Sequence, residues 1–244
     1  MARFRDLKEK LRGLFAAPNL RARLDELDAF PARHLPGPLF SLLLDRDELV
    51  RWRAVEAFGR AVARMAGGVG EGEGLEAARV VVRQCLWRMN EESGGLGWGI
   101  PEALGETLAR HERLAGEFHR VLASYVREEV RGEGNYLEHP GLRRGVYWAL
   151  SRLAESFPEL LAGEVGTLRA GLADEDRGNA GLAARALGLL PPAWTRQARA
   201  EVAALADDPA VVPLFLNGEL THSTTGALAR QALARMDADN GRGK

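Results

Sequence analysis

A short pattern recurs along this chain: an alanine, then a large apolar residue, then a small residue. It stands at Ala57-Phe58-Gly59, Ala103-Leu104-Gly105, Ala149-Leu150-Ser151, Ala186-Leu187-Gly188 and Ala232-Leu233-Ala234. The copies are 46, 46, 37 and 46 residues apart. Periods of roughly 40–47 residues are typical of stacked helix pairs, in which each pair buries its apolar face against the next. The small residue lets neighbouring helices approach closely, and the large one fills the space between them. The pattern therefore predicts an all-helical repeat protein.

The pattern marks the second helix of each pair, and the first helices are expected between its copies. We predict an all-α, right-handed α-α superhelix of about five helix pairs, at approximately 35–66, 75–111, 112–156, 158–190 and 194–236. Residues 1–34 are expected to form an N-terminal helical cap and residues 239–244 a disordered tail. Residues 1–244 are thus expected to form a single repeat domain. Two arms that read as extended chain flank Asn217-Gly218, a strong hairpin signal, so a small β-hairpin is predicted near residues 211–221.

Composition limits the class of partner. The chain has 244 residues and a net charge of −1, so no overall field attracts nucleic acid or an anionic membrane. Cys85 is the only cysteine, which excludes an internal disulfide, and its apolar helical surroundings predict a buried side chain. No apolar run approaches the roughly 20 residues that a membrane span needs. The N-terminus also lacks the apolar core of a signal peptide, so a cytoplasmic location is expected.

Three segments resemble a known family. The run at 50–59, VRWRAVEAFG, resembles the second helix of HEAT repeats, and the resemblance covers about residues 35–236. The segments at 90–105 and 138–145 are similar to an uncharacterised bacterial HEAT-like family found in sulfate reducers. The resemblance implies a HEAT/armadillo-like solenoid with a curved surface that binds mostly proteins, and it implies no known activity.

Rows of side chains on the second helices predict a binding groove. Residues four apart share one face of a helix, and the second helices of such arrays usually line the concave surface. The candidate groove residues are Trp52, Glu56, Arg60, Trp98, Glu102, Glu106, Arg144, Trp148, Arg152 and Arg185. Tryptophan and arginine are enriched at binding hot spots, which favours a groove for a ligand or partner. The alternative is that some of these tryptophans pack between helices while the charges form pairs along each helix.

The loops that precede the second helices are expected to cluster along one edge of the stack. Their candidate binding residues are Asn90, Glu91, Glu92, Glu138, His139, Arg143, Asp176 and Arg177. Polar groups that converge beside a groove would suit a small polar ligand or a peptide chain. The alternative role is helix capping, because such side chains satisfy the free N–H groups at helix starts. The glycine-rich loop at 90–99 is longer than capping requires.

No catalytic residue, metal site or cofactor is predicted. His111-Glu112 resembles the His-Glu pairs of HEAT-type iron hydroxylases, which recur in several repeats, but here the pair occurs once. The remaining histidines lack the His-x-x-x-His spacing of metal ligands. The chain contains neither a Gly-x-x-x-x-Gly-Lys phosphate loop nor a Gly-x-Ser-x-Gly elbow.

Two hypotheses of function follow. The favoured one is a non-enzymatic interaction module that binds a protein partner through the groove and loop 90–99. The alternative is an enzyme resembling the HEAT-type DNA glycosylases that act on alkylated bases. Trp52, Trp98, Trp148 and Glu102 would then face the base, and arginines would contact phosphates. The near-neutral charge and the scarcity of lysine disfavour nucleic acid, and no membrane partner is expected.

Overall fold

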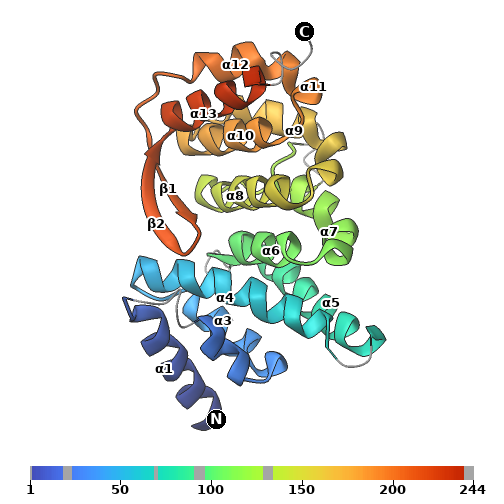
Figure 1. Ribbon diagram of the computed structural model, residues 1–244, viewed down its shortest axis with the longest axis vertical. Coiled ribbons are helices and arrows are strands. Elements are labelled where there is room, and N and C mark those ends of the chain that lie inside the picture. The colour runs from blue at the N-terminus through green and yellow to red at the C-terminus, as the bar shows by residue number, and fades with distance from the viewer. Residues whose placement is uncertain (1, 19–23, 69–70, 91–96, 129–133, 239–244) are drawn as a thin grey trace. The chain divides into compact units, whose positions relative to one another are not determined.

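The computed structural model describes residues 2–18, 24–68, 71–90, 97–128 and 134–238, and these form helices and one two-stranded sheet (Figure 1). The predicted all-α solenoid class, with its small hairpin, is confirmed. The chain divides into two compact units. Unit 1 is Met1–Leu114 with Phe215–Leu220, and unit 2 is Ala115–Leu214 with Thr221–Lys244. The predicted tail at 239–244 lies outside the described residues.

Unit 1 is built around one long helix, α4. Its elements are α1 (Ala2–Ala16), η1 (Leu24–Ala29), η2 (Ala32–His34), α3 (Pro36–Leu42), α4 (Glu48–Ala66), α5 (Glu71–Met89) and α6 (Ile100–Ala109). Asp47 starts α4, because its carboxylate accepts hydrogen bonds from the N–H groups of Leu49 and Val50. Helix α4 then packs against α3, α5 and α6.

Unit 2 is a stack of second helices in which α10 lies between α8 and α13 (Figure 1). Its elements are α7 (Glu112–Ser124, which begins in unit 1), α8 (Pro140–Ser156), η3 (Pro158–Glu164), α9 (Val165–Ala170), η4 (Gly171–Ala173), α10 (Arg177–Leu189), α11 (Pro192–Thr195), η5 (Arg196–Ala198), α12 (Arg199–Ala204) and α13 (Thr225–Ala238). The first helices of the last two repeats are therefore broken into short pieces. Glycines at 163, 166 and 171 favour such breaks in the first of them, since each costs about 1 kcal/mol inside a helix.

The recurring pattern does form the core of both units. All five alanines are buried, and so are Phe58, Leu104, Leu150 and Leu187. The small residues permit close helix contact, as predicted. A Cβ added to Gly59 on α4 would lie 2.6 Å from the backbone of Glu106 on α6. In unit 2, a Cβ on Gly188 of α10 would overlap Ala232 of α13.

The hairpin forms where it was predicted. Strand β1 (Val211–Leu216) pairs with β2 (Glu219–Thr224), so the second strand runs three residues beyond the predicted end. Asn217 and Gly218 have φ values of 54° and 82°, as a tight primed turn requires. The tip of the hairpin, Phe215–Leu220, belongs to unit 1.

In the part of the chain that the structure describes, no helix is both long and apolar enough to span a bilayer.

Candidate functional site

The hairpin tip covers part of the predicted groove face in unit 1. The rings of Trp52 on α4 and Phe215 of the tip are stacked, with centroids 5.6 Å apart and planes 10° from parallel. A Cβ on Gly218 would lie 3.8 Å from a carboxylate oxygen of Glu56, one turn along α4. The chain therefore fills this stretch of the face with its own residues. No feature of the sequence indicates this contact.

The other predicted groove residues of unit 1 divide into two groups. Glu56 and Glu106 come together at Arg110, whose Nη2 lies 3.5 Å and 2.8 Å from their respective carboxylate oxygens. Glu102 lies one turn before Glu106 on the same helix.

Arg60 pairs with other residues than Glu56 and Glu106 do. Its guanidinium lies 2.9 Å from the carboxylate of Asp25 and also pairs with Asp28 of the N-terminal cap. Trp98 is 40% exposed just before α6 begins.

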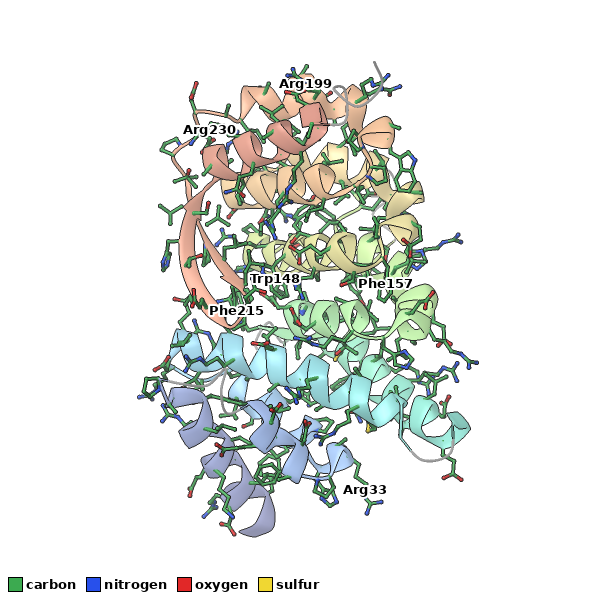
Figure 2. The ribbon with its side chains drawn as sticks, viewed as in Figure 1. Arg33, Trp148, Phe157, Arg199, Phe215 and Arg230 are labelled. Atoms are coloured by element: carbon green, nitrogen blue, oxygen red, sulfur yellow. The ribbon has the colours of Figure 1, made fainter. Side chains whose placement is uncertain are left out.

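The predicted groove residues of unit 2 include one that lies in the core. Trp148 on α8 is only 1% exposed (Figure 2), so its ring packs among the helices, which was the alternative interpretation. Arg144 forms an ion pair with Asp176. Arg152 and Arg185 both pair with Glu155.

Several edge-loop residues act as helix caps, the second role considered for them. His139 accepts a hydrogen bond from the N–H of Gly141 at 3.1 Å, at the start of α8. Asp176 accepts one from the N–H of Asn179 at 3.2 Å, at the start of α10. Arg177 pairs with Asp208 at 2.7 Å. Asn90 is exposed, and Glu91 and Glu92 lie outside the described residues.

Three of the predicted loop residues come together at one pocket of unit 2, which we call the edge pocket. Glu138, Arg143 and Asp176 line this pocket, whose volume is about 1100 Å³. The same wall contains Arg127, Glu128, Tyr136, Tyr147, Thr167, Asp174 and Glu175. Loops and helices of two successive repeats thus meet there, as the clustering of loops predicted.

A buried ion pair fixes the floor of the edge pocket. Arg143 binds Asp174 through two hydrogen bonds of 2.9 and 3.2 Å, and both side chains are under 10% exposed. The third guanidinium nitrogen of Arg143, Nη1, donates to the carbonyl oxygens of Leu137 and Glu138. Burial raises the pKa of Asp174, but hydrogen bonds from Arg143 and from the N–H of Asp176 outweigh it, so the net pKa is lowered. All three guanidinium nitrogens of Arg143 therefore donate hydrogen bonds, and this side chain holds the floor of the edge pocket in a fixed position.

Two tyrosines give the edge pocket its aromatic surface. Tyr147 is 2% exposed and lines the pocket. Gly171 makes room for it, since a Cβ there would lie 2.6 Å from the tyrosine ring. Burial raises the pKa of Tyr147, so the phenol stays protonated and can donate a hydrogen bond. The ring of Tyr136 lies 5.1 Å from the guanidinium carbon of Arg143.

The rim of the edge pocket is acidic. Glu128, Glu138 and Glu175 are exposed, and none forms an ion pair within the described residues. By contrast, the exposed Arg127 is already paired with Glu164 at 2.5 Å. Among the described residues, the exposed charges of this pocket that form no ion pair are therefore negative. Sequence reasoning missed Tyr147, because its place next to Trp148 on α8 looks like any core position.

No cysteine- or histidine-based centre accompanies the pocket. Among the described residues, no group of three or more His, Cys, Asp or Glu side chains is arranged to hold a metal ion. Cys85 is buried, and burial raises the pKa of its thiol to about 12.

Comparisons with known proteins give helical repeat structures and no family. No family model matches the chain, and no curated protein matches it. An engineered protein of known crystal structure is 16% identical, with 95% of this chain and 96% of that one covered and a TM-score of 0.48. A designed armadillo repeat protein is 15% identical, with 93% and 98% covered and a TM-score of 0.45. Computationally designed armadillo repeat proteins for modular peptide recognition are 16% identical over 93% and 98%, with a TM-score of 0.44.

Proposed function

We propose that this chain is a non-enzymatic interaction module that binds a segment of a partner protein. The observation that carries the proposal is the edge pocket, where the buried Arg143–Asp174 pair fixes the wall and exposed carboxylates stand beside two tyrosines. Pockets that bind ligands combine apolar walls with a few polar groups fixed in position. Stacked helix pairs place such loops side by side, and repeat proteins use them as binding surfaces.

The chemistry of the edge pocket favours a basic side chain. The exposed carboxylates of Glu128, Glu138 and Glu175 would attract a lysine or arginine of the partner. The face of Tyr136 would contact its apolar stem or its charge. Because these carboxylates are exposed, their main effect is on the rate and selectivity of encounter, and binding should weaken as salt is added.

A peptide-binding experiment tests this function. Peptides are selected from a random displayed library on the full chain, and the dissociation constants of basic, neutral and acidic sequences are measured by fluorescence anisotropy. We expect basic peptides to be enriched and to bind about tenfold more weakly to the double variant Glu138→Gln/Glu175→Gln. Glu159→Gln is the matched control, because Glu159 is exposed in the same unit and does not line the pocket. Equal loss in both variants, or selection of no peptide, would refute the proposal.

The groove that the sequence predicts on the second helices is a second contact surface in this proposal. Trp98 is its exposed tryptophan, whereas Trp52 is stacked on Phe215 and Trp148 is buried. Trp98→Ala is therefore the informative variant, since Trp148→Ala would disturb the core. If Trp98→Ala binds every selected peptide as well as the wild type does, partner binding does not involve the groove.

No observation favours the glycosylase alternative. That activity requires aromatic rings presented to an extruded base, and Trp148 is only 1% exposed. Membership of the bacterial HEAT-like family and a cytoplasmic location remain proposals, which rest on the segments at 90–105 and 138–145 and on the lack of a signal-peptide core, respectively.

A further inference from the structure

A second pocket of unit 2 adjoins the edge pocket. Its volume is about 680 Å³, and residues of α9, η4 and α12, the broken first helices of the last two repeats, line it. The two pockets share three lining residues, Gly166, Ala170 and Ala173. We call the second cavity the side pocket, and its other lining residues are Arg169, Leu172, Arg177, Glu201, Ala204 and Leu205. The two cavities are therefore continuous along one part of unit 2.

Only small residues stand at the boundary that the two pockets share. Gly166, Ala170 and Ala173 are all exposed, and they follow one another at helical spacing through α9 and η4. A Cβ added to Gly166 would have no other atom within 4 Å, so packing does not require glycine there. The boundary carries no side chain larger than a methyl group. An extended chain can therefore cross it from one pocket to the other.

The charged side chains of the side pocket are paired with carboxylates or guanidiniums of the same unit. The Nε of Arg169 lies 2.9 and 3.0 Å from the two carboxylate oxygens of Glu201. The Nε of Arg177 donates to a carboxylate oxygen of Asp208 at 2.7 Å. The charges that line this pocket therefore cancel, in contrast to the acidic rim of the edge pocket.

Apolar side chains form the rest of the side pocket. Leu172 and Leu205 are buried and line it, and Ala204 adds an exposed methyl group on α12. Such a surface binds by removing apolar area from water, and paired charges give a charged ligand little to bind. The side pocket therefore favours an aliphatic side chain, whereas the edge pocket favours a basic one.

We propose that the side pocket binds an aliphatic residue of the same partner segment that places a basic residue in the edge pocket. The assignment rests on the proposed function, because it concerns the partner of that site. The segment lies extended over Gly166, Ala170 and Ala173, and an extended chain advances about 3.3 Å per residue. The partner therefore carries its basic and aliphatic residues a few positions apart, at one fixed spacing. The aliphatic residue adds affinity to the charge-steered encounter.

A displayed peptide library tests the inference. Each peptide contains one fixed lysine with random residues on both sides, and selection is made on the full chain. We expect leucine, isoleucine, valine or methionine to be enriched at one fixed position relative to the lysine. Replacing that residue by alanine in a selected peptide should raise the dissociation constant about tenfold, because less apolar surface is then removed from water.

Two variants of the chain locate the contact. Ala204→Glu places a carboxylate at the side pocket and should weaken binding of the selected peptide about tenfold, because an aliphatic side chain would displace water from that charge. Ala203→Glu is the matched control. Ala203 is exposed on the same helix, does not line the pocket, and receives the same charge, so this variant should bind like the wild type.

Two further measurements separate direct contact from other effects. The peptide with alanine in place of the aliphatic residue should bind Ala204→Glu and the wild type equally, since the contact is already absent. Thermal unfolding of Ala203→Glu and Ala204→Glu should give the same midpoint, because both positions are exposed on α12.

Three results would overturn the inference and leave the proposed function intact. The first is selection of basic peptides without an aliphatic preference at any fixed position. The second is an equal loss of affinity in Ala203→Glu and Ala204→Glu. The third is enrichment of acidic residues at the fixed position, since Arg169 and Arg177 would then exchange their partners for the ligand. Selection of no peptide would refute the proposed function as well, so the two failures are distinguishable.

Discussion

At the scale of single residues, the Arg143–Asp174 pair is the contact on which the edge pocket depends. Both side chains are under 10% exposed, and each is fully hydrogen-bonded. Breaking such a pair leaves one charge buried without a partner, which is far more costly than breaking a pair in water.

We expect Asp174→Asn to lower the free energy of unfolding by about 3 kcal/mol, because Arg143 would keep its buried charge without a counter-ion. The measurement is urea unfolding at pH 7. Asp237→Asn is the matched control, since Asp237 pairs with Arg199 while both side chains remain about half exposed. Its urea midpoint should scarcely change. Equal effects of the two substitutions would show that burial does not govern the strength of these pairs.

The single-residue predictions differ in outcome for a physical reason. Asp176 caps a helix and also lines the edge pocket, so its capping role is confirmed and its binding role stays a prediction. Trp148 shares its repeat position with Glu56 and Glu102, yet it is buried whereas both glutamates are partly exposed. The register fixes which face of a helix a residue is on. How much of that face is covered depends on the neighbouring helices.

At the scale of elements, the glycines of the repeat pattern set how closely the second helices pack. Gly188→Ala should destabilise the protein by about 1–3 kcal/mol, because the added Cβ overlaps Ala232 on α13. Gly116→Ala is the control, since nothing lies within 4 Å of its Cβ position on α7. That substitution should stabilise by about 0.5–1 kcal/mol through the helix propensity of alanine. Thermal unfolding of both variants measures the contrast, and two changes of the same sign would contradict the prediction.

The hairpin tip makes the other testable contact between elements. A double-mutant cycle of Trp52→Ala and Phe215→Ala should give a coupling energy of about 0.5–1.5 kcal/mol, the range for aromatic pairs. The measurement is urea unfolding of the two single variants and the double variant. Val211→Ala serves as a control on the same hairpin, because Val211 is 62% exposed, and it should not couple to Trp52→Ala. Additive effects of Trp52→Ala and Phe215→Ala would mean that the stacking contributes no stability.

In the hairpin, adjacent residues determine the turn, whereas a residue far away in the sequence determines what the tip contacts. Asn217-Gly218 predicted the turn, because both residues must adopt positive φ there and these residue types do so readily. The contact between Phe215 and Trp52 joins residues from opposite ends of the sequence. No spacing rule relates them, so sequence reasoning had no signal for that contact.

At the scale of the whole molecule, arginine–carboxylate pairs link stability to pH. Hydrogen bonds from Arg12 and Arg177 lower the pKa values of Asp45 and Asp208 respectively, and the net pKa of Asp174 is also lowered. Each folded pKa lies below the unfolded value of about 4. The stability that these groups contribute is therefore fully present above pH 4 and is lost as pH falls through the folded values.

We expect the free energy of unfolding to be nearly flat from pH 7 to 5 and to fall below about pH 4. Urea unfolding at intervals between pH 7 and 3 measures this dependence. Asp174→Asn should show a shallower decline, because it lacks one carboxylate with a lowered pKa. A steeper decline in that variant, or a loss of stability already complete at pH 5, would contradict the assignment.

The sequence by itself determined the all-α class, the positions of the second helices and the hairpin turn. Those properties depend on periodicity, small residues and local backbone preference, which are encoded by residues close together in the chain. Only the tertiary structure decided that Trp148 is core, that Phe215 stacks on Trp52, and that Arg185 on α10 pairs with Glu155 on α8. Burial and charge pairing depend on what side chains from other repeats place against a residue, and the spacing of a repeat does not contain that information.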